Sequence, residues 1–161
     1  MQDLPYWKAL LITLAVIALA LAYIFVASLL GLDDPWIAFV AVTVWSATGM
    51  KMEDTPGIFI GGALGLLISL AMEALPDLYG DWAAILPAAA IVLSISFVIK
   101  GWLPLFCNFG LFIFLTIGSA EIFLDQRLQL LYLQDLAFGA LCFWIVPWLV
   151  MKARSGNTAD G

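Results

Sequence analysis

Histidine is absent from this sequence, and charged residues are scarce. Asp, Glu, Lys and Arg make up 11% of the 161 residues, against roughly a quarter in ordinary soluble domains. Without histidine, and without a cluster of Cys or carboxylates at ligand spacing, the chain lacks the usual ligands of a metal site. A serine or threonine nucleophile needs a nearby base, and the sequence offers neither a histidine nor an obvious carboxylate partner for that role. We therefore expect no metal, no cofactor and no enzyme activity.

Basic residues are few as well. Six Lys and Arg stand against twelve Asp and Glu, and they form no cluster. Because binding to phosphates needs a basic patch, we expect no nucleic-acid partner. The two cysteines, Cys107 and Cys142, lie inside apolar runs at different estimated depths, so we expect small buried hydrophobic residues and no disulfide.

Hydrophobic residues make up 65% of the chain and fall into long runs. Six runs lie near 8–30, 35–50, 56–72, 82–99, 103–120 and 131–151. Helices of about this length cross the roughly 30 Å hydrocarbon core of a bilayer. The sequence predicts an all-α polytopic membrane protein with six transmembrane helices, a single domain over 1–154 and a flexible polar tail over 155–161.

The basic residues predict the orientation of these helices. Six spans put both termini on one side, and that side then carries Lys8, Lys51, Lys100, Lys152 and Arg154. Arg127 alone lies on the other side. The positive-inside rule then indicates a multi-pass membrane protein with both termini cytoplasmic. The outer side carries Asp33, Asp34, Glu73, Asp77, Asp81, Glu121 and Asp125, either as plain solvated loops or as a vestibule that concentrates cations.

The second and third runs show a likeness to the fifth and sixth. Each pair joins a helix that begins with proline and ends with glycine to a helix that contains Gly-Ala-Leu, at 62–64 and at 139–141. Adding the first and fourth runs gives two units of three helices, 8–72 and 82–151. Because three spans leave the next unit starting on the opposite side, such a three-plus-three repeat is inverted, as in many channels and secondary transporters.

Runs two and three are shorter than a usual span, at near 16 residues or about 24 Å. Plain short helices in a thinned bilayer and helices that stop within the protein are the two alternatives, and we favour the first. Asp34 before Pro35 and Thr55 before Pro56 are the expected N-caps of these helices.

Three glycines, Gly57, Gly61 and Gly65, recur every four residues on one face of the third helix. Glycine costs a water-exposed helix roughly 1 kcal/mol relative to alanine. In lipid, however, a face of small residues lets two helix backbones approach closely. We therefore predict a helix-packing face, used in the fold or in assembly of a homo-oligomer.

Polar residues inside the apolar runs are candidates for a solute path. Asn108 lies in run five, and Gln134 and Asp135 lie at the start of run six. An acid in the membrane interior is a candidate site because a charge at the helix centre costs about 2.5–3.5 kcal/mol. The alternative places Asp135 only one turn inside the outer interface. In run two, Phe39, Thr43 and Trp45 are candidates for an aromatic, hydroxyl-bearing constriction, or else face lipid or core.

The segment “PWIAFVAVTVWSATG”, followed by a glycine-rich third helix, resembles the domain-of-unknown-function 1097 family of bacterial inner-membrane proteins. The likeness rests on Trp36, Phe39, Thr43, Trp45, Gly61, Gly62 and Gly65. The chain departs from the family in its acidic turn, “KMEDTPG”. The resemblance implies a small multispan membrane protein and assigns no functional residues.

The sequence favours a membrane channel or facilitator for a small neutral or cationic solute, embedded in the lipid bilayer as a homo-oligomer. One alternative is a non-transporting membrane scaffold or accessory subunit of a larger complex, whose glycine face docks another protein. A third is a proton- or ion-coupled transporter that uses Asp135. The identity of the solute does not follow from the sequence, because selectivity depends on pore radius and on the direction of a few side chains.

Overall fold

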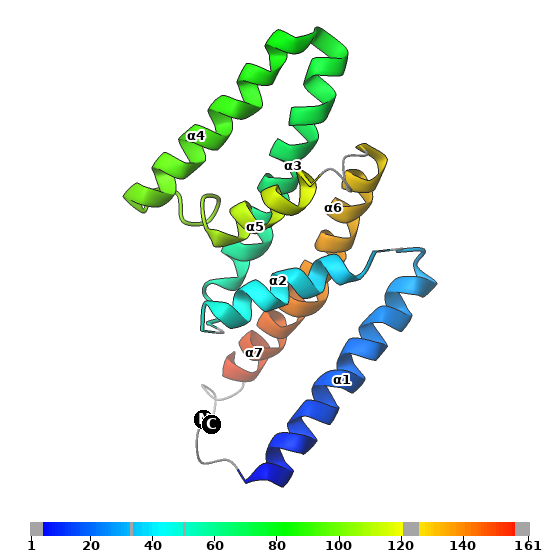
Figure 1. Ribbon diagram of the computed structural model, residues 1–161. Coiled ribbons are helices and arrows are strands. Elements are labelled where there is room, and N and C mark those ends of the chain that lie inside the picture. Colours follow the sequence, from blue (N-terminus) through cyan, green and yellow to red (C-terminus); the bar gives the residue numbers. More distant parts are fainter. Residues whose placement is uncertain (1–4, 33, 50, 121–125, 157–161) are drawn as a thin grey trace.

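The computed structural model describes residues 5–32, 34–49, 51–120 and 126–156, and the regular secondary structure of these ranges is entirely helical. The elements are α1 (Tyr6–Leu29), α2 (Trp36–Ala47), α3 (Thr55–Tyr79), η1 (Asp81–Ala84), α4 (Ile85–Lys100), α5 (Phe109–Gly118), α6 (Gln126–Ala140), the π-helical segment η3 (Leu141–Ile145) and α7 (Val146–Gly156). Successive helices alternate in direction. In Figure 1, α1, α3 and α5 run towards the upper right, whereas α2, α4 and α6–α7 run back towards the lower left.

The helix lengths fit a membrane protein. Among the described residues, three helical stretches are long and apolar enough to cross a bilayer: Thr55–Tyr79, Asp81–Lys100 and Leu128–Leu149. Three shorter apolar stretches are Val16–Leu29, Trp36–Ala47 and Phe109–Gly118. The predicted all-α class is thus confirmed. Three of the acids expected on the outer side, Asp33, Glu121 and Asp125, lie outside the described residues.

The fifth helix is shorter than the sequence indicates, because α5 begins at residue 109 and not at 103. Gly101, with a φ of 66°, ends α4 in a Schellman motif: its N–H donates to the Val98 carbonyl at 3.1 Å, and the Trp102 N–H donates to the Phe97 carbonyl at 2.8 Å. Residues 102–108 then form turns. An apolar composition alone does not reveal such a break.

Two other helices extend past their predicted ends. α3 continues through Pro76 to Tyr79, whereas the prediction ends at 72. The sixth run is one continuous rod in which η3 links α6 to α7. Pro147 explains this π segment, because it has no N–H to donate to the Phe143 carbonyl one turn earlier. Ser155 and Gly156 end α7, and the rest of the expected tail, 157–161, lies outside the described residues.

The expected side-chain N-caps are wrong. At the start of α2, Asp34 Oδ1 accepts a hydrogen bond from the Trp36 indole at 3.2 Å, and no side chain caps the helix. At the start of α3, Thr55 Oγ1 donates to the Lys51 carbonyl at 3.4 Å. Asp54 holds the N-cap position with helical dihedrals, φ −84° and ψ −19°, and its side chain makes no capping bond. A side-chain cap needs an extended backbone at that position.

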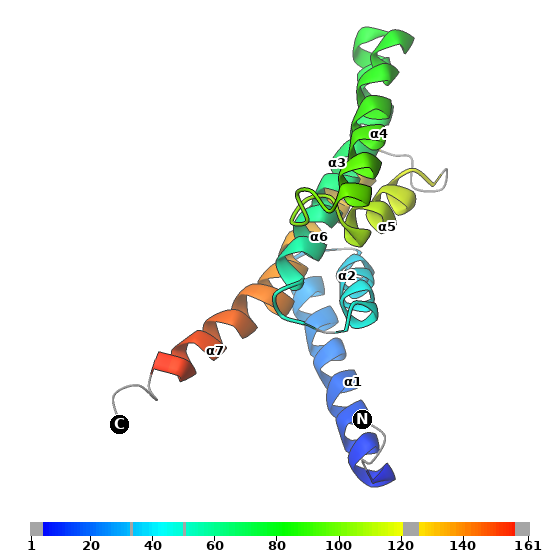
Figure 2. The ribbon, with the colours of Figure 1, turned by 90° about the vertical axis from the view of Figure 1, so that its left-hand side faces the viewer.

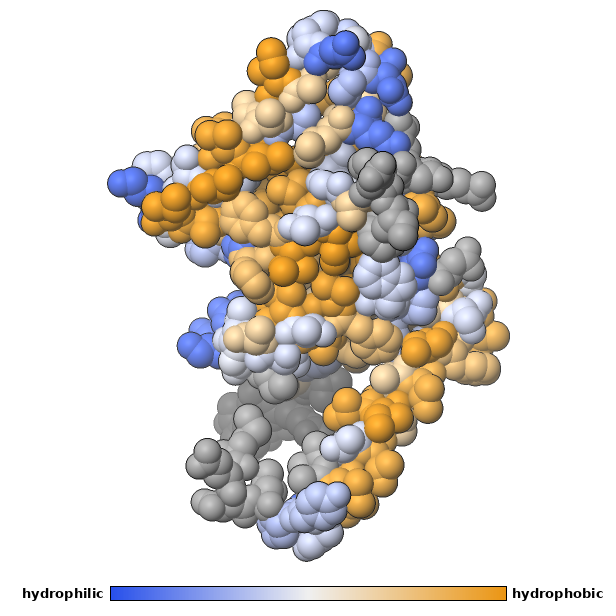
Figure 3. All heavy atoms as spheres, viewed as in Figure 1, coloured by the Kyte–Doolittle hydropathy of each residue, from blue (hydrophilic) through white to orange (hydrophobic). Residues whose placement is uncertain are grey.

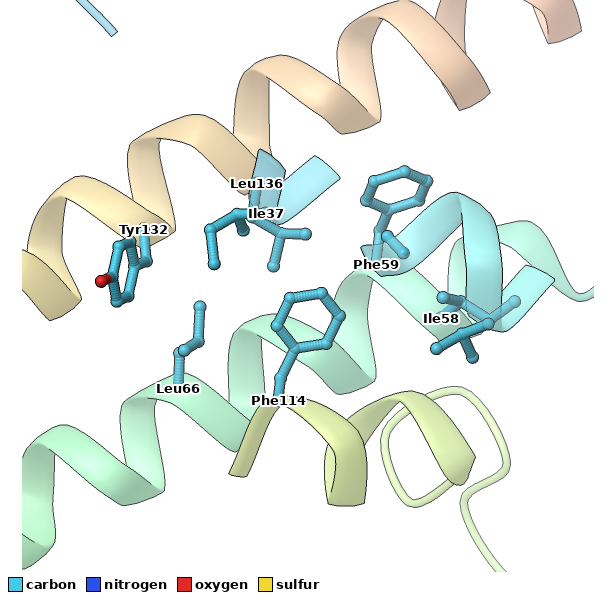
Figure 4. Packing of buried hydrophobic residues seen from close by; sticks show 9 residues of the cluster. Ile37, Ile58, Phe59, Leu66, Phe114, Tyr132 and Leu136 are labelled. Carbon is cyan, nitrogen blue, oxygen red and sulfur yellow. The ribbon is translucent and has the colours of Figure 1, made fainter. Parts of the chain in front are cut away.

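Two long helices, α3 and α6, form the centre of the fold, and each holds one short helix. α5 packs along α3, α2 packs on α6, and α3 also contacts α6. Figure 2 shows α2 and α5 on the same side of the molecule. Phe114 of α5 points into the shared core, which is made of Ile37, Ala41, Val44, Ile58, Phe59, Leu66, Phe114, Tyr132 and Leu136 (Figure 4).

The glycine face of α3 lies against α5. A Cβ atom at Gly61 would lie 2.5 Å from Asn108 Oδ1, and one at Gly65 would lie 2.8 Å from the Leu115 nitrogen. At Gly57 the nearest atom, Asn108 Nδ2, would be 3.3 Å away. The contact between α3 and α5 is therefore a close approach of two backbones, which larger residues would prevent.

The outer helices α1 and α4 bury little. Among the side chains described, α1 buries only Tyr23 and Ala27, and α4 buries only Pro87 and Ser94. In Figure 3, apolar residues cover the middle of the visible face, while hydrophilic residues gather around the α3–α4 turn and at the far end of α4. An apolar surface of this extent fits lipid or another copy of the chain.

Candidate solute path

A groove of about 330 Å³ lies between the two short helices. Phe39 and Thr43 of α2 line it, and Phe109 and Ile113 of α5 form the opposite wall. The remaining lining residues, all from α2, are Trp36, Val40, Val44 and Ala47. The walls are therefore apolar apart from the Thr43 hydroxyl. Such a surface suits a small neutral or weakly polar molecule and penalises an ion that must lose its water.

Thr43 and Trp45, although both were predicted to line one constriction, lie in different surroundings. Thr43 Oγ1 donates to the Phe39 carbonyl of its own helix at 2.8 Å, and the residue is exposed and lines the groove. Trp45 packs against the core, and its indole Nε1 donates to the Lys51 carbonyl at 2.8 Å. Trp45 thus ties the end of α2 to the turn that follows it.

Asn108 joins α5 to α3. Its Oδ1 accepts from the Leu111 N–H at 3.3 Å and so caps α5, while Nδ2 donates to the Gly57 carbonyl at 2.7 Å and to the Pro104 carbonyl at 3.0 Å. The side chain also lines a hollow of about 580 Å³ with Glu53 and Asp54 of the acidic turn. Because its polar atoms are already engaged by backbone groups, Asn108 has a structural role in this geometry.

Asp135 and Gln134 are neighbours on α6 but differ in burial. Asp135 is 1% exposed, and its Oδ2 accepts from the backbone N–H of Asp34, just before α2, at 3.1 Å. Gln134 is exposed. The buried carboxylate of α6 therefore holds the start of α2 and meets the positive end of that helix.

A polar cluster that the sequence did not single out lies where α3, α5 and α6 meet. Gln129 of α6 is fully buried, and its Nε2 lies 3.4 Å from Ser69 Oγ, 3.4 Å from Glu73 Oε2 and 3.2 Å from the Gly118 carbonyl oxygen. The expected solvation of Glu73 at a helix end is thus only partial, since the residue is half-buried. Gln129 lies just before run six, at a position where the sequence suggests only a glutamine at the membrane interface.

Other chemistry-bearing groups do not converge. Among the described residues, no three His, Cys, Asp or Glu side chains come close enough together to share a metal ion. Cys107 and Cys142 are free thiols. The hydroxyls of Ser28, Ser46, Thr48, Ser96 and Thr116 each donate to a carbonyl three or four residues earlier in the chain. These hydroxyls serve their own helices.

Comparison with known proteins adds no relative: no family model, no curated protein and no solved structure matches this chain. The likeness to the domain-of-unknown-function 1097 family therefore rests on the residues alone. Any function must be argued from the arrangement of the side chains.

Proposed function

We propose that this chain is a membrane channel or facilitator for a small neutral or cationic solute. The apolar groove favours a neutral solute, and the acids Asp77 and Asp81 beside the α3–α4 turn would raise the local concentration of a cationic one. The observation that carries the proposal is the groove between α2 and α5, with Thr43 as its polar group and Phe39 and Phe109 on its two walls. Two helices of 12 and 10 residues rise about 18 Å and 15 Å, which is less than an ordinary hydrocarbon core, so they would span the membrane where the bilayer is thinned around them. Paired short helices offer a thin barrier that a small solute can cross.

The proposed architecture is six spans in two inverted units. In the view of Figure 1, a half-turn about an axis perpendicular to the page exchanges the places of α1 and α4 and those of α2 and α5. The outer helices follow this relation less well, because α3 stays beside α4 whereas α7 diverges from α1 in Figure 2. The glycines of the repeated Gly-Ala-Leu agree with this relation. A Cβ at Gly62 would lie 2.7 Å from Phe114 of α5, and a Cβ at Gly139 would collide with Ala38 of α2. Each glycine therefore faces the short helix of the other unit.

The proposed location is the bacterial inner membrane, with both termini cytoplasmic. In Figure 1, α2 and α4 end on the left of the molecule, and α1 begins and α7 ends near its bottom. Lys8, Lys100 and Lys152 lie in these helix ends. The acids Asp77 and Asp81 lie at the opposite end, beside the α3–α4 turn. The placement of these lysines agrees with the positive-inside rule.

Thiol labelling tests this topology. In a Cys107→Ala, Cys142→Ala background, Asp77→Cys and Lys100→Cys each introduce one thiol at an opposite end of α3–α4. A membrane-impermeant maleimide is expected to label Asp77→Cys in intact spheroplasts and Lys100→Cys only after lysis. Labelling of both variants, or the reverse pattern, would contradict six spans with cytoplasmic termini.

Solute flux tests the function. Purified protein in liposomes is challenged with neutral, cationic and anionic solutes, and volume changes are followed by light scattering. We expect faster flux for at least one small neutral or cationic solute and a lower rate in Thr43→Val. Thr116→Val is the matched control, because Thr116 is an exposed hydroxyl of α5 that donates to its own helix and does not line the groove. No flux for any solute would refute the proposal.

A coupled transporter is the second candidate, and the burial of Asp135 supports it. A buried acid in a membrane protein is a common element of ion or proton pathways. In this case an imposed proton or sodium gradient should change the solute flux of the wild type. If Asp135→Asn removes this effect of the gradient while passive flux remains, coupling is assigned to Asp135. If flux is absent and a single partner copurifies in stoichiometric amount, the scaffold or accessory-subunit alternative replaces both.

A further inference from the structure

Hydrogen-bond donors and acceptors do not balance in the cluster around Gln129. The amide nitrogen has two protons but faces three oxygens, those of Ser69, Glu73 and Gly118. Gln129 Oε1, in contrast, is buried and accepts no hydrogen bond. A buried polar atom without a partner costs about 1–3 kcal/mol, so a native structure rarely leaves one. The cluster has a surplus of oxygen acceptors.

If the Gln129 side-chain amide is rotated by a half-turn, its oxygen joins the other three oxygens as a possible ligand of a cation. Oxygen and nitrogen of a glutamine amide exchange places by this rotation. Oε1 would then lie 3.4 Å from Ser69 Oγ, 3.4 Å from Glu73 Oε2 and 3.2 Å from the Gly118 oxygen, at the present place of Nε2. Nε2 would move to the present place of Oε1, which no donor reaches. Oε1 would then face the Glu73 carboxylate and the Gly118 carbonyl, neither of which has a proton to donate, and a cation between these oxygens would offset their repulsion.

These spacings fit a cation of moderate size. Oxygens bound at about 2.3–2.6 Å, as around Ca²⁺, lie about 3.3–3.7 Å apart when they meet at right angles at the ion. Mg²⁺, at about 2.0–2.1 Å, would need oxygens about 2.9 Å apart. The observed spacings of 3.2–3.4 Å agree with the larger of the two radii.

The charge of the site selects a monovalent ion. Glu73 is the one carboxylate among the four groups, so a single positive charge is neutralised and a divalent ion is not. The Gly118 carbonyl belongs to the last turn of α5, where the helix dipole also favours a cation. All four ligands are oxygens, which suits a hard ion. We propose that Gln129 Oε1, Ser69 Oγ, the Glu73 carboxylate and the Gly118 carbonyl bind a sodium ion, which has nearly the radius of Ca²⁺ and half its charge.

This site is separate from the groove between α2 and α5, so its test does not depend on solute flux. Thermal unfolding of the purified protein in detergent is compared in NaCl, KCl and choline chloride at equal ionic strength. Sodium at ten times its dissociation constant raises the folding equilibrium constant about 11-fold, which corresponds to ~3–6 °C in Tm. We expect this rise in NaCl, saturating with concentration, and at most a smaller one in KCl.

Two pairs of variants link the effect to the site. Gln129→Met and Glu73→Gln are expected to lose the difference between NaCl and choline chloride. Their controls are Gln134→Met, at an exposed position of α6, and Asp77→Asn, one turn beyond Glu73 at an exposed position of α3, and both are expected to keep it. The difference is measured within each variant, so a general loss of stability does not imitate it.

Three results would overturn the sodium site. One is a wild-type Tm that is equal in NaCl and choline chloride. Another is an equal rise in NaCl and KCl, which would indicate a general salt effect. The third is a sodium effect that persists in both Gln129→Met and Glu73→Gln.

Discussion

Gly61→Ala tests how closely α3 and α5 must approach. The new Cβ would meet the Asn108 side chain at 2.5 Å from Oδ1, 2.6 Å from Nδ2 and 2.9 Å from Cγ. Real Cβ atoms do not approach other atoms so closely, so Asn108 must move. It would then lose the cap on Leu111 and the hydrogen bond to the Gly57 carbonyl.

The magnitude follows from these losses. Losing an N-cap costs about 0.5–2 kcal/mol. Extra volume in a tight contact costs about 1–3 kcal/mol. The higher helix propensity of alanine returns up to about 1 kcal/mol. We therefore expect Gly61→Ala to destabilise the protein by about 1–4 kcal/mol, and Gly61→Leu by more.

A double-mutant cycle separates this mechanism from a general intolerance of the helix. Thermal or denaturant unfolding in detergent is measured for the wild type, Gly61→Ala, Asn108→Ala and the double variant. Because Asn108→Ala removes the atoms with which the new Cβ collides, Gly61→Ala is expected to cost at least about 0.5 kcal/mol less in that background. Ala89→Leu, which adds bulk at an exposed position of α4, is the control and should change little. Additive effects, or a Gly61→Ala variant as stable as the wild type, would refute the reasoning.

Three further substitutions test other contacts by the same unfolding measurements. Gly139→Ala should destabilise the contact between α2 and α6, and Ala38→Gly should restore part of the loss because it removes the Cβ that collides with the new one; no rescue would contradict this packing. Asp135→Ala leaves the Asp34 N–H without its acceptor and should cost about 1–3 kcal/mol, whereas the exposed Gln134→Ala should stay within about 0.5 kcal/mol; equal effects would argue against the buried hydrogen bond. Trp45→Phe removes the 2.8 Å hydrogen bond to the Lys51 carbonyl and should cost about 1 kcal/mol, and an unchanged Tm would exclude a contribution of this bond.

Apolar composition and run length are strong signals, and they predicted the helical class and the approximate place of the helices in the described chain. The ends of the helices depend on weaker, local chemistry. The Schellman motif at Gly101 and the cap by Asn108 shorten α5, yet both lie inside what reads as one apolar run. Pro76 would be expected to end α3, but the helix continues to Tyr79, because a helix can continue past a proline when other contacts hold it.

Candidate site residues were harder to predict, because a helix position does not tell which neighbour a side chain meets. Thr43 and Phe39 lie one turn apart on α2 and do share the groove. Trp45, two residues after Thr43, points elsewhere and bonds the following turn. Gln129 gave no signal in the sequence, since its three partners come from α3 and the end of α5, 11 to 60 residues away. Only the tertiary structure brings them together.

The crossed pairing of the short helices has a consequence for how the chain is made. α2 is held mainly by α6, and α5 mainly by α3, so each half of the chain supplies the support that the other half lacks. A polypeptide that ends at Tyr79, before the α3–α4 turn, would leave α2 without α6 and the glycine face of α3 without α5. During synthesis, the first half should therefore remain incompletely packed until the second emerges from the ribosome. Two fragments divided at Gly80 should complement each other when they are made in the same cell, although neither should persist alone.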